Sequence, residues 1–354
     1  MTDLRTQAAA PRISVVIAAY NAAATLGETL RSLEAQTLRP MEIVVVDDGS
    51  TDNTWELLER SGPSIRAFRQ VNSGIGAARN RGMREAKGDF IALLDADDIC
   101  DPARLQIQYE YLNAHPDLLL CSTDFSSFDT SGLLERSSIG SYYSRCSARH
   151  GGVRARYPEQ QWLLLPIQAC GLPAGDRVEC HAGQVFDQMM LGNFIHPCTV
   201  MFRREALEAA GNFDPSIRIA CEWEWLVRVT RVGRVGYISL PLLRYRRSPG
   251  QISSSPGMNL DSLRVARLIH ERYASEVHSL SPGAVRRQLG NLELQAAYAL
   301  APVQRTKAFA LLASSAFRHR VLSDVSLRTL VRVLLPAGAL RGLRTARRRL
   351  RSPA

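Results

Sequence analysis

The sequence lacks several features that mark well-known protein classes. It has no uninterrupted run of about 18 apolar residues, the length that a helix needs to cross a membrane. Its first residues contain no hydrophobic stretch typical of a signal peptide. Its seven cysteines include no C-x-x-C pair, which suits free thiols in a reducing compartment better than a disulfide framework. We therefore expect a cytoplasmic protein.

Two nucleotide-binding signatures are also missing. No G-x-x-x-x-G-K-[ST] stretch is present, which disfavours a P-loop ATPase, and no G-x-G-x-x-G follows the first expected strand, which disfavours a dehydrogenase-type fold. A zinc site made from Cys146, His150, Cys170, Cys180 and His181 can be imagined, but their spacing matches no strong zinc pattern. Loop or core thiols are the simpler interpretation.

Positive charge is abundant and uneven. Lys and Arg number 44 against 34 Asp and Glu, a net charge of +10, and residues 331–354 carry seven Arg and no acid. Such a tail is either a solvated helix packed on the catalytic domain or a basic amphipathic helix lying on an anionic membrane surface. The second interpretation would place the protein at the inner face of the cell membrane.

The first 120 residues alternate strand and helix patterns. Apolar runs predict strands at 13–20, 42–50, 65–71 and 90–95. Helices are expected between them, including one over 74–86. Continuous apolar strands separated by helices predict an α/β fold of the doubly wound kind, with a mostly parallel sheet covered on both faces.

The pattern weakens between residues 121 and 192 and then returns. A strand is predicted at 198–204, a helix at 221–233 and two further strands after it, whereas helices follow residue 256. The chain is therefore predicted to comprise a nucleotide-binding half, a second half and a basic helical C-terminal extension, at 11–125, 126–255 and 256–354.

Polar clusters follow three of the predicted strands. They are Tyr20-Asn21, Asp47 to Ser50, and Asp95 to Asp98. Ligands of doubly wound sheets lie beyond the carboxyl ends of the strands, so the three clusters should converge on one crevice.

The third cluster places three carboxylates within four positions. Like charges this close raise one another's pKa unless a cation or a donor-rich ligand lies between them. Mg²⁺ and Mn²⁺ prefer oxygen ligands from one or two carboxylates together with substrate phosphates, so Asp95 and Asp97 predict a cation bridged to a diphosphate. Asp98 could instead cap the helix that starts near Pro102.

Several ordered stretches together resemble an inverting family 2 glycosyltransferase of the GT-A fold. They are SVVIAAYNAAATLGETLRSLEAQTLRPMEIVVVDDGSTDNT, NSGIGAARNRGMREAKGDFIALLDADD and FDPSIRIACEWEWLVRV. The resemblance is close over 11–125 and looser over 193–250. It implies a nucleoside-diphosphate sugar donor, most often a UDP-sugar, and a glycan or lipid-linked acceptor in cell-surface polysaccharide or glycoconjugate synthesis. No nucleic acid partner is expected.

The resemblance also implies roles for individual residues. Asp97 would hold Mg²⁺ or Mn²⁺ as part of a DXD-type motif, and Asp95 would assist it while leaning toward the ribose. The residues expected to bind the nucleotide-sugar are Ala19, Tyr20, Asn21, Asp47, Asp48, Ser50, Arg79, Asp95 and Ala96.

The catalytic base of this family is the second member of an acidic pair before a helix that ends in Arg. Counting back from Arg228 gives Glu222, whereas Cys221 occupies the first position and Glu replaces the usual Asp. Glu224 is the alternative base. The two side chains point roughly 200° apart on a helix, so only one can face the donor.

Two further positions stay open at the level of sequence. His196, before a proline, either touches the acceptor or is structural. Ser248 stands where relatives usually carry a His, so a diphosphate or metal contact of that His is in doubt, and Arg246 or Arg247 could supply charge instead.

Other functions are compatible with parts of the pattern. A sugar-1-phosphate nucleotidyltransferase would need a Gly-rich G-x-x-T-R-like loop after the first strand, which the sequence does not have. A sugar-nucleotide-binding relative without activity would keep the same strands. The sequence does not specify the sugar or the acceptor.

Overall fold

The computed structural model describes residues 11–249, 251, 253 and 255–334. They form two compact units. Most residues up to Ser248 form the first, which we call the sheet unit, whereas 190–192 and the residues from Pro249 onward form the second, the helical unit. The sheet unit thus contains the half predicted at 11–125 and most of the half predicted at 126–255, whereas 190–192 and the residues after Ser248 belong to the helical unit.

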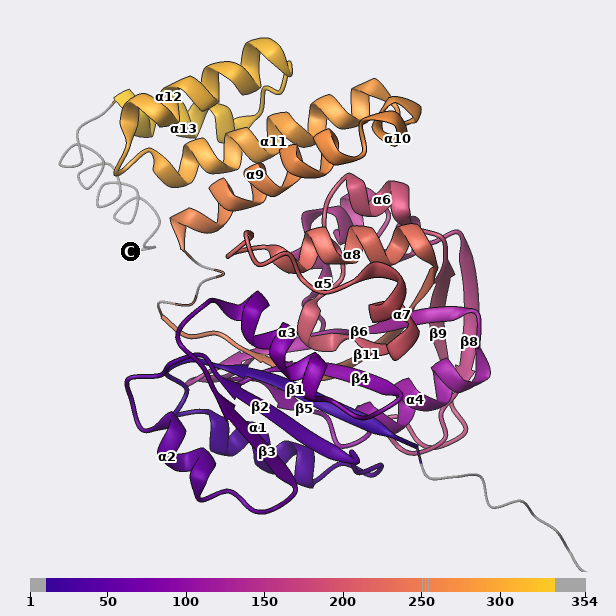
Figure 1. Cartoon of the computed structure of the whole chain (residues 1–354). Helices are drawn as coiled ribbons and strands as arrows, with labels where there is room; N and C mark the ends of the chain where they lie inside the picture. Colours follow the sequence, from indigo (N-terminus) through magenta and orange to yellow (C-terminus); the bar gives the residue numbers. More distant parts are fainter. Residues whose placement is uncertain (1–10, 250, 252, 254, 335–354) are drawn as a thin grey trace, which may run out of the picture. The chain divides into compact units, whose positions relative to one another are not determined.

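The described part of the sheet unit contains one sheet of 11 strands (Figure 1). Nine strands follow one another in the order β3-β2-β1-β4-β10-β6-β11-β9-β8, while β5 pairs with β11 and β7 with β6. The strands are β1 Ile13–Ala19, β2 Glu42–Asp47, β3 Ile65–Arg69, β4 Phe90–Asp95, β5 Ile99–Cys100, β6 Leu118–Asp129, β7 Gly132–Glu135, β8 Glu159–Leu164, β9 Arg177–Gly183, β10 Met201–Arg203 and β11 Arg234–Arg246.

The first four strands along the chain, β1 to β4, are parallel and lie side by side. Successive side chains of a strand point to opposite faces of the sheet. Val15 and Ile17 of β1 are buried, and so is Val16 between them. The sheet is therefore covered on both faces here, which explains why its strands are continuously apolar.

Beyond β4 the sheet becomes mixed. β10 runs antiparallel to both β4 and β6, β6 is parallel to β11, and β9 and β8 continue antiparallel. The two strands predicted after residue 233 are one strand, β11, whose register shifts between Ile238 and Arg244. The predicted α/β architecture is confirmed.

Helices connect and flank these strands. They are α1 Leu26–Glu34, α2 Thr54–Glu59, α3 Ile75–Glu85, α4 Arg104–Ala114, α5 Ile139–Tyr142, α6 Phe186–Met190, α7 Arg204–Ala210 and α8 Cys221–Val232. Helix α3 packs closely on the sheet at Gly82. A Cβ built at this position would lie 2.4 Å from Val16 Cγ1 and 3.5 Å from Val46 Cγ2, so the helix approaches the sheet too closely for a larger residue.

The helical unit contains α9 Pro256–Arg272, α10 Ala274–Ser279, α11 Pro282–Leu300, α12 Arg305–Ala313 and α13 Asp324–Leu334. Its apolar core includes Leu294, Ala297 and Leu312. Glu293, 1% exposed, accepts a 2.8 Å hydrogen bond from Arg267. The predicted helical extension is confirmed up to residue 334, whereas the rest of the basic tail lies outside the described residues. None of the helices described is both long enough and apolar enough to cross a membrane.

The close packing at Gly82 gives a test of the fold. Gly82→Ala should lower the free energy of unfolding by about 1–3 kcal/mol, because the new methyl group overpacks the contact with Val16. Gly27→Ala in α1 is the matched control, since its Cβ would have only contacts of 3.6 Å or more. The control should stabilise the helix by about 0.5–1 kcal/mol. Denaturant unfolding of both variants checks this, and equal effects of the two changes would contradict the packing.

Candidate active site

The carboxyl ends of β1, β2 and β4 come together at one edge of the sheet. β1 lies between the other two strands. The backbone N–H of Asp48 donates to the carbonyl of Ala19 (2.8 Å), and Thr25 Oγ1 donates to the carbonyl of Ala96 (3.0 Å). The convergence predicted from the three polar clusters is confirmed.

Asp47 and Asp48 are both buried and hold the surrounding loops. Asp47 accepts a hydrogen bond from the backbone of Ser50 (3.1 Å) and forms an ion pair with Arg69 Nε (3.1 Å). Asp48 Oδ1 accepts from Gln70 (2.8 Å), and its two oxygens accept the backbone N–H groups of residues 73 and 74 at 2.9 and 2.8 Å. These carboxylates therefore hold the loops that follow β2 and β3, and any nucleotide contact would use their remaining acceptor capacity.

Tyr20 and Asn21 follow directly after β1. The Tyr20 ring is 53% exposed. Asn21 has a left-handed backbone (φ 50°), which Asn tolerates better than most residues. Its side-chain oxygen accepts the backbone N–H of Thr51 at 2.8 Å, and its own N–H donates to Ser50 Oγ at 2.9 Å. The turn after β1 is thereby attached to the turn after β2, and Tyr20 is left accessible.

Arg79 forms the first cationic contact of the acidic cluster. Its Nη2 lies 2.6 Å from Asp95 Oδ1, and the side chain is 2% exposed. Burial raises the pKa of Asp95, but the Arg79 guanidinium, together with Cys198 and His196, lowers it, and the net pKa lies below the usual value. Nε of Arg79 is buried and has no hydrogen-bond partner in the described part of the chain. Asp95 is therefore charged and matched by Arg79.

The other two carboxylates of the cluster are not matched in this way by Arg79. Oxygens of Asp95, Asp97 and Asp98 lie within 4.8 Å of one another. Burial, and then repulsion from Asp97 and Asp95, raise the pKa of Asp98 well above its usual value. Asp98 Oδ2 is buried without a hydrogen-bond partner among the residues described. A hard divalent cation fits such an oxygen-rich group.

Arg246, at the end of β11, fastens the acidic turn. Its backbone N–H donates to Asp98 Oδ1 (3.0 Å), its Nε donates to the carbonyl of Asp97 (2.8 Å), and its Nη2 contacts Glu28 Oε2 (2.5 Å). From the sequence, Arg246 was expected only to supply charge in place of the His that relatives carry where this chain has Ser248. The structure gives its guanidinium a positioning role at the acidic turn. Arg247 has a different partner, Glu135, at 4.0 Å.

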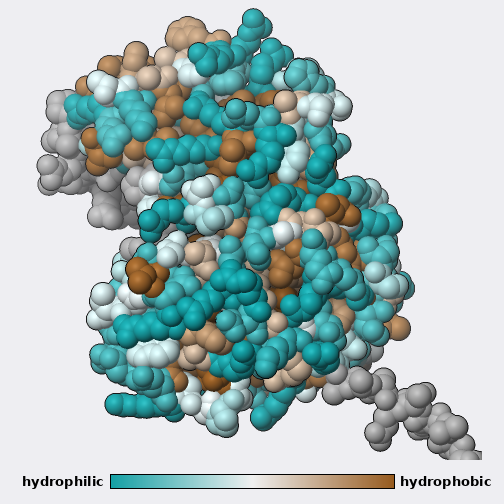
Figure 2. Space-filling view, in the orientation of Figure 1, coloured by the Kyte–Doolittle hydropathy of each residue, from teal (hydrophilic) through white to brown (hydrophobic). Residues whose placement is uncertain are grey.

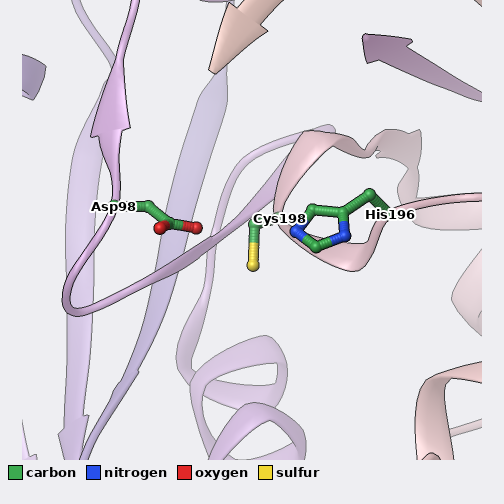
Figure 3. A group of neighbouring side chains, drawn as sticks. All are labelled: Asp98, His196 and Cys198. Atoms are coloured by element: carbon green, nitrogen blue, oxygen red, sulfur yellow. The ribbon is translucent and has the colours of Figure 1, made fainter. Parts of the chain in front are cut away.

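His196 lies beneath the acidic turn. It is 3% exposed, its ring stacks on Phe125 at 4.3 Å, and Nδ1 lies 3.3 Å from the Tyr143 hydroxyl. Burial lowers the pKa of His196 to about 3, so the ring is neutral. Figure 3 shows the ring beside Cys198 and Asp98, whose ligand atoms lie within 4.8 Å of the His196 nitrogen. This burial favours the structural interpretation of His196 that the sequence had left open.

Helix α8 carries both glutamates considered as the base. Glu224 is fully buried and paired with Arg228, whose Nε and Nη2 lie 2.9 Å from its two oxygens. Arg228 also donates to the carbonyls of Ala210 and Asn212. Glu224 thus anchors α8 to the segment after α7.

Glu222 lies in the first turn of the same helix and is only partly buried. Burial raises its pKa, while the Arg79 guanidinium acts in the opposite direction. Arg79 therefore lies in the field of both Asp95 and Glu222. Close packing of the two helix starts explains this, since a Cβ at Gly76 in α3 would lie 3.2 Å from Cys221 Sγ.

The cysteines and histidines considered for zinc do not form a ligand cluster. Within the described ranges, two groups of side chains could share a metal ion, namely Asp95-Asp97-Asp98 and Asp98-His196-Cys198. Neither contains a residue between 146 and 181. Sequence reasoning missed Cys198 and Tyr143, although the position of Cys198 two residues after His196 was visible in the sequence.

Comparisons with known proteins find similarity to glycosyltransferases. Residues 14–168 match the family model described as glycosyl transferase family 2. An uncharacterized glycosyltransferase of Rickettsia typhi is 25% identical over 245 residues, which cover 69% of this chain and 67% of that protein. The cholesterol galactosyltransferase of Borreliella burgdorferi is 32% identical over 33% of this chain and 34% of its own length. Three further curated relatives are covered over 31%, 41% and 36% of their length.

A solved structure shows the same fold. S. aureus TarS 1-349 in complex with UDP-GlcNAc superposes with a TM-score of 0.52 at 16% identity, over 91% of this chain and 87% of that one. Its likeness extends the comparison beyond the residues that the family model matches. The chain therefore has the GT-A fold, and its residues 14–168 are similar to glycosyl transferase family 2.

Proposed function

We propose that this protein transfers a sugar from a nucleoside-diphosphate sugar, a UDP-sugar in the first instance, to a glycan or lipid-linked acceptor with inversion. The process served would be the synthesis of a cell-surface polysaccharide or glycoconjugate. The observation that carries the proposal is the position of Arg79. It pairs with Asp95 of the acidic cluster and lowers the pKa of Glu222, so one guanidinium interacts with both the cluster and the candidate base. The TarS complex with UDP-GlcNAc supports a nucleotide-sugar donor.

The acidic cluster would hold Mg²⁺ or Mn²⁺ through Asp97, with Asp95 as a second ligand. The mutual repulsion around Asp98 supports this assignment, because a divalent cation would relieve it. The cation, when bound, would neutralise the charge of the departing diphosphate. Arg79 would keep Asp95 ionised, and Arg246 would keep the carbonyl of Asp97 turned away from the ligand.

Glu222 would act as the base. A sugar hydroxyl is a poor nucleophile, so a carboxylate must take its proton as the bond to the anomeric carbon forms. The raised pKa of Glu222 makes its carboxylate a stronger proton acceptor than an ordinary one. Attack from the side opposite the departing diphosphate would invert the anomeric centre.

The basic C-terminus would hold the enzyme at an anionic membrane surface. In α13, Leu327 and Leu334 are 66% and 64% exposed, and Arg328 and Arg332 lie on the same helix. Figure 2 shows apolar residues among hydrophilic ones on the visible surface of the helical unit. Exposed apolar side chains next to arginines are typical of interfacial helices.

Replacing Glu222 tests the assignment of the base. Glu222→Gln should lower the transfer rate roughly 100- to 10,000-fold, because a neutral amide cannot take the acceptor proton. Donor binding, measured by calorimetry, should be retained. In the wild type the rate should fall as pH drops through an apparent pKa above 4.5, since Glu222 must be deprotonated and its pKa is raised from that value.

Glu224→Gln is the matched control for this experiment. It should lower the unfolding temperature, because Arg228 loses its charged partner. The folded enzyme should keep its rate within a few-fold, because the Gln side-chain oxygen can still accept a hydrogen bond from Arg228 and hold α8 in place. A Glu222→Gln variant that retains full activity, or whose residual activity keeps the acidic limb, would remove Glu222 from the role of base.

Replacing Asp97 tests the cation site and the donor class together. A panel of nucleotide-sugars incubated with Mn²⁺ should yield at least one that the protein hydrolyses or transfers. Asp97→Asn should lose this activity and the Mn²⁺-dependent part of UDP affinity, while weak binding in EDTA stays unchanged. If Mn²⁺ has no effect on UDP affinity in the wild type, the cation assignment is wrong. If no nucleotide-sugar binds, the transferase proposal fails.

Vesicle sedimentation tests the membrane proposal. The full chain should sediment with vesicles containing anionic lipid and not with zwitterionic ones, and binding should fall as salt rises because surface charge is screened. A chain ending after Leu334, which lacks six of the tail arginines, should bind more weakly. Equal binding to both kinds of vesicle would contradict an electrostatic attachment.

A further inference from the structure

Two buried polar atoms at the acidic turn have no hydrogen-bond partner. Nε2 of His196 and Oδ2 of Asp98 form no hydrogen bond within the described part of the chain, and the two residues are 3% and 0% exposed. The other oxygen of Asp98 accepts the backbone N–H of Arg246 at 3.0 Å. Leaving a buried polar atom unpaired destabilises the folded state, so such atoms call for an explanation, for example a bound ion.

A thiol lies beside both residues. One ligand atom each from Asp98, His196 and Cys198 lies within 4.8 Å of the other two. In Figure 3 the Cys198 side chain is drawn between the other two side chains, and Nε2, the ring nitrogen farther from the backbone of His196, is on the side of the thiol. Cys198 is 1% exposed. The three side chains therefore converge at one buried point.

Two turns of the sheet unit hold these side chains. Asp98 lies between β4 and β5, whereas Cys198 lies in the 3-10 helix Pro197–Thr199, directly after His196 and before β10. Thr199 donates to the carbonyl of His196 from its backbone N–H at 3.0 Å and from its hydroxyl at 2.7 Å. These bonds keep His196 and Cys198 on the same turn, so both can contact the same ligand.

The ring of His196 is held through its other nitrogen. The Tyr143 hydroxyl lies 3.3 Å from the carbonyl of Ile195 and 3.3 Å from Nδ1 of His196. Both contacts are hydrogen bonds when the hydroxyl donates to the carbonyl and accepts from Nδ1–H. Nε2 then carries a lone pair and no proton. Histidines that bind metals are usually held through the second nitrogen in this way.

The three ligand atoms are of different kinds, namely a carboxylate oxygen, an imidazole nitrogen and a sulfur. Zn²⁺ binds all three kinds, whereas Mg²⁺ and Mn²⁺ prefer oxygen. Zn²⁺ bonds of about 2.0–2.3 Å in a tetrahedral site place neighbouring ligand atoms about 3.3–3.8 Å apart. Since the three atoms already lie within 4.8 Å of one another, a shift of about 1 Å would close the group around an ion.

Hydrogen bonding by the thiol is the competing explanation for this cluster. Cys198 interacts with the carboxylates of Asp95 and Asp98. A thiol has one proton to donate, however, and Nε2 of His196 stays unpaired in that arrangement. One cation bound to all three side chains would pair both orphaned atoms at once.

The cluster shares Asp98 with the acidic group and otherwise differs from it. Asp95 and Asp97, to which we assign Mg²⁺ or Mn²⁺, are partly exposed, whereas His196 and Cys198 are buried. The assignment of Asp97 and Asp95 leaves Asp98 without a role in the proposed chemistry. Its carboxylate is therefore available to a second ion of a different kind.

We propose that Asp98, His196 and Cys198 form a structural Zn²⁺ site, separate from the site for Mg²⁺ or Mn²⁺. When the ion binds, the thiol releases its proton to the solvent and the sulfur bonds to Zn²⁺. A water molecule or an oxygen of Asp95 completes the four ligands. The ion joins the turn after β4 to the turn before β10, and so holds the acidic turn from below. This site goes beyond the proposed transfer reaction and does not depend on it.

Cobalt titration tests the site by a signal that requires the sulfur. The full chain is freed of metal with a chelator and titrated with Co²⁺, which replaces Zn²⁺ in sites of this kind. We expect a thiolate-to-cobalt charge-transfer band in the near ultraviolet, together with the strong visible bands of tetrahedral Co²⁺. One equivalent of Zn²⁺ should remove these bands, whereas excess Mg²⁺ should not. The absence of the charge-transfer band, or its loss with Mg²⁺, would overturn the site.

Three cysteine variants locate the sulfur ligand. Cys198→Ser should abolish the charge-transfer band and weaken Zn²⁺ binding at least tenfold. Cys146→Ser, the same change at a buried cysteine outside the cluster, should alter Zn²⁺ affinity less than twofold. Cys170→Ser, at an exposed thiol beside Asp101, should also alter it less than twofold. Loss of the band in Cys170→Ser would show an adventitious surface site, and equal effects of all three changes would likewise contradict the assignment.

X-ray absorption of the zinc-loaded wild type tests the ligands without a variant. The spectrum should show one sulfur at about 2.3 Å and nitrogen or oxygen neighbours at about 2.0–2.2 Å. A zinc ion surrounded by oxygen and nitrogen alone would mean that the acidic group, and not this cluster, binds it. Zn²⁺ should also raise the unfolding temperature of the wild type but not that of Cys198→Ser, because only a ligand bound to the folded state stabilises it.

The outcome is separable from that of the proposed function, since none of these measurements needs a donor or transfer. Asp97→Asn, which should lose the Mn²⁺-dependent part of UDP affinity, should keep the cobalt charge-transfer band. Loss of the band in this variant would show one shared metal site and overturn a separate one. A protein that gives the band but hydrolyses no nucleotide-sugar would retain the zinc site and lose the transferase assignment.

Discussion

Asp95, Asp97 and Asp98 place carboxylate oxygens within 4.8 Å of one another at the end of a buried strand, and the surrounding structure is organised around their repulsion. Arg79 neutralises Asp95 from one side, while Arg246 supplies two donors to the turn from another. In the proposed function, a divalent cation held by this turn would reduce the repulsion further.

The orientation of α8, the helix that carries the candidate base, depends on a second charged pair. Glu224 and Arg228 form an ion pair, and Arg228 also donates to backbone carbonyls at the end of α7 and just after it. These contacts fix the rotation of α8 about its axis. Residues 222 and 224 point in nearly opposite directions on the helix. Fixing the position of Glu224 therefore also determines the direction in which Glu222 points. In the described part of the chain, Glu222 accepts a long hydrogen bond of 3.9 Å from Cys221 Sγ, so its orientation depends mainly on that of the helix.

Much of the fold over residues 11–125 could be predicted, because each strand there is marked by residues that are close together in the sequence. The strands β1, β2 and β4 are continuous apolar runs, and their polar ends follow directly in the sequence. By contrast, β6 was not foreseen, because its buried residues include Ser122, Thr123 and Asp124, whose hydroxyl and carboxyl groups are satisfied by contacts that the sequence does not reveal.

The same reason explains why parts of the candidate site could not be predicted from the sequence. Glu224 and Arg228 are four residues apart, so their pairing on a helix could be predicted from the sequence. The burial of this pair, which lets it hold α8 in place, could not. The burial of His196 depends on aromatic rings from three other segments, and its meeting with Asp98 depends on the turn after β4. Each of these involves residues that come together only through the tertiary fold.

The hydrogen bond from Arg246 to Asp98 joins residues separated by 148 positions, whereas the bonds of Asp48 span only 22 to 26. Contacts with short sequence separation close smaller loops and form earlier, at lower entropic cost. The loops around Asp48 can therefore form while the chain is still being synthesised, but the acidic turn is fastened only after β11 has left the ribosome. The order of assembly thus runs from the turn after β2 to the turn after β4, and a chain interrupted before residue 246 would have formed loops around Asp48 with an unfastened acidic turn.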